Sequence, residues 1–145
     1  MKVVEKNVLV GHTPAQMYAL VNDFERYPRF LPWCGKAEVH ARDGEHVVAS
    51  LSIDYFKVKQ RFSTRNICVE GESIKMELVD GPFESLEGYW QFQPLGTIGC
   101  KIEFRLSYQF SSRILEKLIG PVFEHISASL VDAFIKEADR IYDHV

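Results

Sequence analysis

The strongest constraint on the fold comes from residues 36–110, where apolar and polar residues alternate over a series of short segments. A period of two is the spacing of a β-strand that has one buried face and one solvated face. Turn-forming pairs such as Asp43-Gly44 separate the segments, as expected for β-hairpins. The pattern predicts an antiparallel sheet with strands at residues 36–43, 46–56, 58–70, 73–80, 84–94 and 98–110.

A further strand and a short helix precede this region. Residues 2–10 alternate loosely and predict a first strand. Thr13, Pro14 and Gln16 then have the order of a capping box with proline at the first helical position, so we expect a helix over 14–22.

The region after the strands is helical. Residues 113–143 carry a continuous apolar stripe at helical spacing, with charged residues on the other side. Gly120-Pro121 predicts an interruption, with a short lead-in turn before a longer main helix. We expect one domain over 1–145. The predicted fold class is α+β, with a curved antiparallel sheet of about seven strands wrapped around the long C-terminal helix.

The composition excludes some classes of protein. A net charge of −3 and a pI near 5.9 argue against a general nucleic-acid binder, which normally carries a basic excess, but they leave room for a local basic patch. No uninterrupted apolar run approaches the ~20 residues that span a bilayer, and the N-terminus lacks the apolar stretch of a signal peptide. Cys34, Cys68 and Cys100 have no paired spacing, so we expect reduced thiols. Together these features predict a cytoplasmic protein.

Residues 24–35 favour binding over catalysis. Five large apolar side chains and two prolines fall within this segment, so we expect it to be buried or to form one wall of a pocket. The sequence has no nucleophile elbow, phosphate-binding glycine loop, dinucleotide fingerprint or metalloprotease motif. We therefore expect neither an enzyme nor a metal site.

The segment 58–70 carries polar groups on both of its faces. By the period-two register, Thr64 and Asn66 face inward with Phe62. They either pair with the backbone or internal water, or they line a cavity and orient a ligand. The outward positions carry a basic stripe of Lys57, Lys59, Arg61 and Arg65. This stripe is either a solvated face or a partner surface for RNA or anionic lipid heads.

Several ordered blocks resemble one known family. The run Met17–Asp23 and the Tyr-Pro-x-Phe-Leu-Pro run from Tyr27 resemble the coenzyme-Q-binding, polyketide-cyclase-like branch of the START superfamily. The same branch is matched by the blocks Phe62–Asn66, Leu78–Phe83, Trp90–Pro94 and Val122–Phe134. Within the branch, the chain is most similar to the bacterial ribosome-association toxin A proteins.

The resemblance implies a helix-grip fold with a deep apolar cavity between the sheet and the long helix. Mitochondrial relatives bind ubiquinone and support respiration, whereas the toxin branch binds the large ribosomal subunit and blocks its joining to the small one. Our main expectation is an internal site for ubiquinone or a related isoprenoid lipid, with no tightly bound cofactor. The alternative is a ribosome-association toxin that inhibits translation, and a polyketide cyclase-type enzyme is the weakest option. The expected partners are a hydrophobic small molecule, the large ribosomal subunit and the membrane surface, but not DNA.

We expect the cavity to lie between the sheet, the long helix and residues 27–34. The expected apolar lining is Tyr27, Phe30, Leu31, Trp33, Tyr55, Phe62, Phe83, Trp90, Phe92, Phe104, Tyr108, Phe123, Ile126 and Leu130. Thr64 and Asn66 are the polar groups available to a quinone carbonyl. The alternative is a dry core in which the aromatic side chains interlock.

Overall fold

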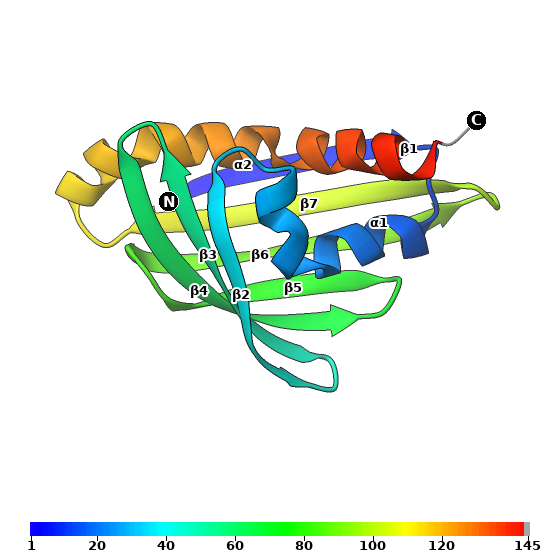
Figure 1. The fold of residues 1–145 in the computed structure, drawn as a ribbon, viewed down its shortest axis with the longest axis horizontal. Helices are drawn as coiled ribbons and strands as arrows, with labels where there is room; N and C mark the ends of the chain where they lie inside the picture. The colour runs from blue at the N-terminus through cyan, green and yellow to red at the C-terminus, as the bar shows by residue number, and fades with distance from the viewer. Residues whose placement is uncertain (144–145) are drawn as a thin grey trace.

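The computed structural model describes residues 1–143, in which seven antiparallel strands form one curved sheet around a long helix (Figure 1). The elements in chain order are β1 (Lys2–Val10), α1 (Pro14–Asn22), the 3₁₀ helix η1 (Phe24–Arg29), β2 (Cys34–Asp43), β3 (His46–Tyr55), β4 (Val58–Val69), β5 (Ser73–Asp80), β6 (Phe83–Leu95), β7 (Gly99–Phe110) and α2 (Arg113–Tyr142). The predicted α+β class, the strands and the long C-terminal helix are confirmed.

Strands β2 to β7 form a meander, and β1 adds to it at the edge beside β7. The order of the sheet is β1-β7-β6-β5-β4-β3-β2, so β1 and β7 are the only neighbours that do not follow one another as strands. β1 pairs with β7 from Lys2, opposite Tyr108, to Val10, opposite Cys100. Register shifts interrupt β2 twice, and such bulges bend a strand and increase its twist. The curved sheet partly encloses α2, η1 and α1 (Figure 1).

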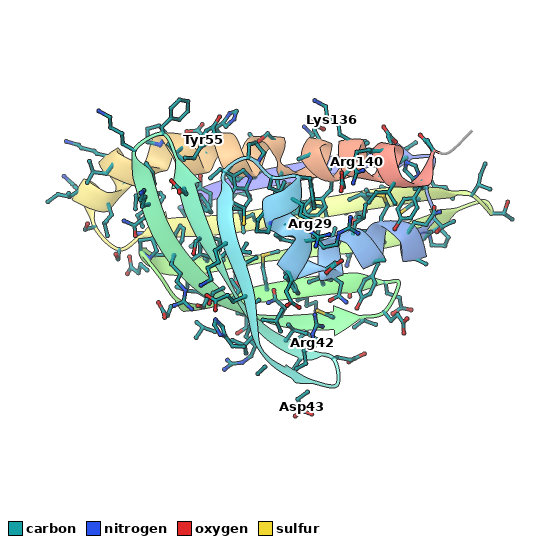
Figure 2. The ribbon with its side chains drawn as sticks, viewed as in Figure 1. Arg29, Arg42, Asp43, Tyr55, Lys136 and Arg140 are labelled. Atoms are coloured by element: carbon teal, nitrogen blue, oxygen red, sulfur yellow. The ribbon has the colours of Figure 1, made fainter. Side chains whose placement is uncertain are left out.

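The two ends of the β2–β4 layer lie far apart. Tyr55, at the end of β3, lies beside α2, whereas Arg42 and Asp43 mark the turn between β2 and β3 at the opposite end (Figure 2). The hairpin between β3 and β4 therefore brings its tip to the helix.

α1 begins as its sequence predicts. The Thr13 hydroxyl accepts a 3.1 Å hydrogen bond from the Gln16 backbone N–H, and the Gln16 side-chain carbonyl accepts one of 2.9 Å from the Thr13 N–H. This reciprocal pairing satisfies two N–H groups that would lack partners at a helix start. Met17 and Val21 are buried on the inner face of the helix.

α2 corrects one prediction. The helix is continuous from Arg113 to Tyr142, with Pro121 inside it and no separate lead-in turn. A proline leaves the carbonyl four residues earlier without its helical donor. That carbonyl belongs to Lys117, and both Lys117 and Pro121 are exposed. Water can hydrogen-bond the freed carbonyl there, so the helix does not have to break.

The inner face of α2 forms much of the core. Phe123, Ile126 and Phe134 are almost fully buried, while Leu130 is only half-buried, less than its place in the stripe predicts. By length and composition, α2 is the one helix among residues 1–143 that could cross a membrane, which corrects the expectation that no such stretch exists. Core helices of soluble proteins meet the same two criteria, and this one packs against β7 and α1.

Candidate functional site

The segment after α1 forms one wall of an internal cavity. Its first six residues form the 3₁₀ helix η1, with Pro28 inside it. A 3₁₀ helix of this length has few internal hydrogen bonds to lose to a proline. The Tyr27 hydroxyl donates a 2.5 Å hydrogen bond to the Val21 carbonyl. Burial raises the pKa of this phenol well above its usual value, so it remains a neutral donor.

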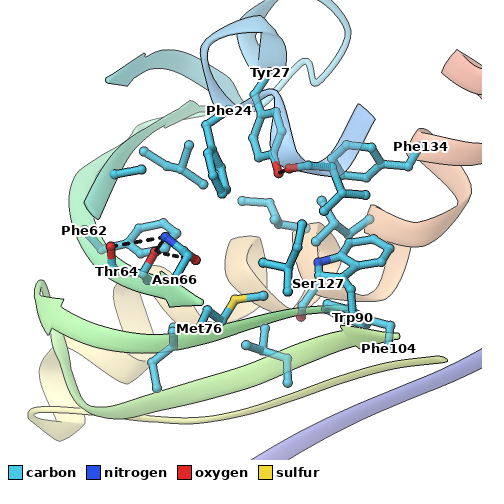
Figure 3. Close-up of a pocket in the computed structure, with 18 of the residues that line it drawn as sticks. Phe24, Tyr27, Phe62, Thr64, Asn66, Met76, Trp90, Phe104, Ser127 and Phe134 are labelled. Carbon is cyan, nitrogen blue, oxygen red and sulfur yellow. Dashed lines mark hydrogen bonds between the residues drawn. The ribbon is translucent and has the colours of Figure 1, made fainter. Parts of the chain in front are cut away.

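The cavity lies between η1, the inner face of the sheet and α2 (Figure 3). It offers about 70 Å³ to the centre of a water-sized sphere. One water needs roughly 10–15 Å³ on this measure, so the space exceeds a packing defect. The core is therefore not completely filled. Of the residues predicted to line it, those that do are Tyr27, Trp33, Phe62, Thr64, Asn66, Trp90, Phe104, Phe123, Ile126 and Leu130.

Three predicted lining residues are buried elsewhere in the core. Phe83 and Tyr108 pack around Phe123, with ring centroids 5.0 and 4.7 Å from it, and they fill the space beyond the cavity. Phe92 packs edge-on against Tyr18 of α1, with centroids 6.2 Å apart. Side chains can share the inner face of the sheet and still meet neighbouring side chains rather than the cavity.

Three further predicted residues face a second hollow instead. Phe30, Leu31 and Tyr55 line an open groove outside the cavity, which offers about 470 Å³ on the same measure. The helix side of the groove carries Lys136 and Arg140 (Figure 2). Trp33 lines both spaces and is 6% exposed, so its indole forms part of the wall between them.

The sequence analysis missed ten residues of the cavity wall. They are Val21, Phe24, Ala49, Leu51, Ile74, Met76, Leu86, Leu106, Ser127 and Phe134. A signal for two of them was available. The two-residue loop between β3 and β4 fixes the register, which places Leu51 opposite Phe62 and Ala49 opposite Thr64. Opposed residues share a face of the sheet, so both follow from the inward placement of Phe62.

The hydroxyl and amide groups of the cavity are already paired. Asn66 Nδ2 lies 3.2 Å from the Val47 carbonyl. It also lies 3.1 Å from Thr64 Oγ1 (Figure 3). The Ser127 hydroxyl donates a 2.9 Å hydrogen bond to the Phe123 carbonyl. Thr64 and Asn66 thus combine the two alternatives, because they pair within the protein and also line the cavity. A ligand carbonyl would have to compete for the Asn66 amide.

Three residues of the predicted partner surface lie on the outer face of the sheet, and the fourth, Lys57, lies in the loop between β3 and β4. Lys57, Lys59, Arg61 and Arg65 are all exposed. Acidic residues oppose two of them, since Asp54 pairs with Lys59 and Glu77 with Arg65 in the strand register. A shallow hollow of about 380 Å³ runs past Lys36, Lys59 and Arg61.

A chain of side-chain hydrogen bonds connects Arg61 to buried residues of the sheet. Arg61 Nη2 lies 3.1 Å from His40 Nε2. His40 Nε2 lies 2.5 Å from the hydroxyl of Ser50. Ser50 in turn contacts the Ser63 hydroxyl at 2.6 Å, and both serines are buried. The guanidinium is therefore positioned by neighbouring side chains although it is exposed.

Two groups of potentially reactive residues, the three cysteines and a cluster around His12, are accounted for by their packing and hydrogen bonds. Cys34, Cys68 and Cys100 are free and buried, as expected. His12, Asp139 and Asp143 form the one described cluster with metal-ligand spacing, which the sequence analysis missed. His12 Nε2 already shares a 2.7 Å hydrogen bond with Asp139, and this contact ties the end of α2 to the start of α1.

The sequence is similar to one protein family and to several proteins of known name. A family model described as polyketide cyclase/dehydrase and lipid transport matches residues 10–135. The ribosome association toxin RatA of Vibrio cholerae is 41% identical over 142 residues, which cover 98% of this chain and 99% of the toxin. The mitochondrial coenzyme Q-binding protein COQ10 of Drosophila melanogaster is 30% identical over 139 residues, covering 93% of this chain and 57% of that protein.

A solved structure extends the comparison to the fold. The Zhui aromatase/cyclase from Streptomyces sp. R1128 superposes with a TM-score of 0.84 at 16% identity, covering 96% of this chain and 94% of that one. At this identity the likeness concerns the fold alone. The family model spans most of the chain, and the relatives align over nearly all of it. The chain therefore belongs to the START-like polyketide cyclase/dehydrase and lipid-transport family, and RatA toxins are among its relatives.

Proposed function

We propose that this protein associates with the large ribosomal subunit and inhibits translation by blocking subunit joining. The observation that carries the proposal is the 41% identity to a ribosome association toxin, which extends over 98% of this chain and 99% of the toxin. The two chains thus match over their whole lengths rather than in a shared core alone. The proposal implies a cytoplasmic protein, because it must meet ribosomes.

The basic stripe on β4 is the surface proposed for this contact. Ribosomal RNA presents phosphate groups, and a protein with a net charge of −3 needs a local concentration of cations to bind them. Lys59 and Arg61 lie beside a shallow hollow, and His40 holds the Arg61 guanidinium. The stripe is on the opposite side of the sheet from the cavity, so ligand binding and ribosome association do not compete for it.

Charge reversal tests the stripe. Changing Lys59, Arg61 and Arg65 to Glu should abolish co-sedimentation with large subunits and leave folding intact, since exposed substitutions rarely cost much stability. The matched control reverses Arg29, Arg42 and Lys136, which are exposed, lie off the stripe (Figure 2) and make no ion pair within residues 1–143. Co-sedimentation that survives the first triple change and raised salt would rule out the stripe.

The cavity favours a second activity, the binding of a hydrophobic ligand. Its lining is apolar apart from the paired hydroxyl and amide groups and the indole nitrogens of Trp33 and Trp90, as in most small-molecule sites. The relative named as a coenzyme Q-binding protein supports ubiquinone or a related isoprenoid lipid as the ligand. Sites for drug-sized ligands usually measure about 300–1,000 Å³, so a quinone requires side chains such as Met76 to move.

The ligand proposal has a direct test. Native mass spectrometry and lipid extraction of the purified protein should detect a bound lipid, and a ubiquinone analogue should quench Trp33 and Trp90 saturably. Both indoles line the cavity, so ligand within it lies against them. Absence of a co-purified lipid together with unsaturable quenching would overturn this activity and leave ribosome association intact.

We also propose that the cavity binds without catalysing a reaction. Within residues 1–143 its wall includes no carboxylate, imidazole or amine, the groups that usually act as general acids and bases. The cyclase-type function is therefore the least supported.

A further inference from the structure

The tip of the β3–β4 hairpin presents an aromatic ring to solvent. Phe56 is 81% exposed, and its backbone has a φ of +54°. Phe56 is the first residue of a two-residue hairpin loop. When the first loop residue has a positive φ and the second does not, it is usually glycine. A bulky residue in the left-handed region is strained, and exposure of the ring gains nothing for the fold. This combination points to a role outside the folded core.

A stack of rings fixes the hairpin tip against α2. The Tyr55 ring lies 4.5 Å from that of Phe56 and stacks on the His125 imidazole, with centroids 5.9 Å apart and planes inclined by 4°. Figure 2 shows Tyr55 beside the helix. Tyr55 therefore connects Phe56 to His125 and holds the hairpin tip beside the outer face of α2.

The same face of α2 carries two further exposed apolar side chains. Ile114 is 72% exposed and Leu118 is 66% exposed, one helical turn apart. His125 follows Leu118 by seven positions, which is close to two turns, so Leu118 and His125 share a face. Phe56, Ile114 and Leu118 are called the apolar ridge below.

The ridge is flanked by cations. Lys57, Arg113 and Lys117 are exposed beside it, and within residues 1–143 none of them makes an ion pair. The hairpin loop and residues 113–118 include one acidic residue, Glu116. The local charge is therefore positive in a chain whose net charge is −3.

We propose that the apolar ridge docks this protein onto an anionic lipid bilayer. Phe56 and Leu118 enter the boundary between headgroups and acyl chains, while the three cations contact the anionic headgroups. An RNA base can stack on an aromatic ring such as that of Phe56 but gains little from the aliphatic side chains of Ile114 and Leu118. A bilayer accommodates all three apolar side chains and binds the cations beside them. The activity is distinct from ribosome association, which is assigned to Lys59, Arg61 and Arg65 on β4.

Sedimentation with lipid vesicles tests the docking surface. The full chain should bind vesicles of phosphatidylcholine that contain phosphatidylglycerol, and it should bind pure phosphatidylcholine vesicles weakly. Changing Phe56→Asn and Leu118→Ser together should lower the partition coefficient about tenfold or more, because both apolar contacts are lost. Changing Lys57 and Lys117 to Glu should remove the preference for anionic vesicles.

Two controls separate docking from folding. Ile98 is 74% exposed in the turn between β6 and β7, at the other end of the molecule from the β3–β4 tip (Figure 1), so Ile98→Ser should leave vesicle binding unchanged. Phe56→Asn should unfold at a higher denaturant concentration than the wild-type protein, since asparagine tolerates a positive φ. A residue kept for stability would show the opposite change.

Three results would overturn the proposal. The first is no binding of the wild-type protein to anionic vesicles, and the second is an equal loss of binding in Ile98→Ser. The third is that the Phe56 and Leu118 variant loses co-sedimentation with ribosomes while the wild-type protein binds no vesicles. That result would make the ridge a ribosome contact. Wild-type ribosome binding in the same variant, with vesicle binding lost, supports the proposal.

Discussion

The ring of Phe134 on α2 packs edge-on against the indole of Trp90 on β6, with ring centroids 5.3 Å apart. The same ring also meets Tyr27 and Phe30, each at a centroid distance of 5.2 Å. Phe134 is 1% exposed and lines the cavity. One side chain thus joins the helix, the sheet and the η1 segment at the wall of the candidate site.

Phe134→Ala should cost about 3–5 kcal/mol of unfolding free energy, because it removes a buried aromatic ring and leaves a larger hole. Chemical denaturation monitored by circular dichroism measures the loss. Leu118→Ala on the exposed face of the same helix is the control and should change stability by less than about 0.5 kcal/mol. A loss below about 1 kcal/mol for Phe134→Ala would contradict the packing described above.

The fold followed from the sequence because its elements obey local rules. Alternation in β7 and the hairpin turns set the strands, and the capping box at Thr13 set α1. The continuity of α2 through Pro121 did not follow, since it depends on whether the freed carbonyl faces water or the core. The η1 helix likewise depends on the packing of Tyr27 rather than on a local pattern.

The cavity could be predicted only in part. Period-two register correctly places Phe62, Thr64 and Asn66 at the wall. Register cannot decide between a cavity and a filled core, which explains why Phe83 and Tyr108 were expected at a wall they do not reach. That outcome depends on how neighbouring rings fill space in three dimensions.

Glu137 should make stability depend on pH. It is buried, and Arg140 donates hydrogen bonds of 2.7 and 2.9 Å to its two oxygens, which lowers the pKa of the carboxyl below 4.5. The stabilisation is fully present above that value and is lost as the pH falls through the lower pKa of the folded state. Glu137→Gln should therefore destabilise the protein at pH 7 but make little difference in strong acid.

Denaturation midpoints at a series of pH values check this dependence. Glu84→Gln, at an exposed site on β6 that makes no ion pair within residues 1–143, should show no such difference from the wild-type protein. An equal stability of Glu137→Gln and the wild-type protein at pH 7 would show that the contact with Arg140 contributes nothing.

The three thiols should resist alkylation while the protein is folded. Burial raises the pKa of Cys34 and of Cys100 to about 11, and it also raises the pKa of Cys68. At pH 8 a thiol with such a pKa is ionised in roughly one molecule in a thousand, and the thiolate is the reactive form. Iodoacetamide labelling followed by mass spectrometry should modify the denatured protein fully and the folded protein slowly. Rapid labelling of Cys34 in the folded state would mark it as accessible and reactive.

Filling the cavity should separate ligand binding from ribosome association. Ala49 is 3% exposed, lies on β3 opposite Thr64 and lines the cavity, so a leucine at this position projects into the open space. Because the space is vacant, Ala49→Leu should change stability by about 1 kcal/mol or less. The affinity for a ubiquinone analogue should fall about tenfold or more, since the added side chain occupies volume that the ligand needs.

The control for this variant is Ala128→Leu, which places the same side chain at an exposed position of α2. It should bind the analogue as the wild-type protein does, and both variants should co-sediment normally with large ribosomal subunits. Fluorescence titration and ribosome sedimentation of the same preparations provide the comparison. If Ala49→Leu binds the analogue with wild-type affinity, the ligand lies elsewhere, and the open groove beyond Trp33 becomes its site.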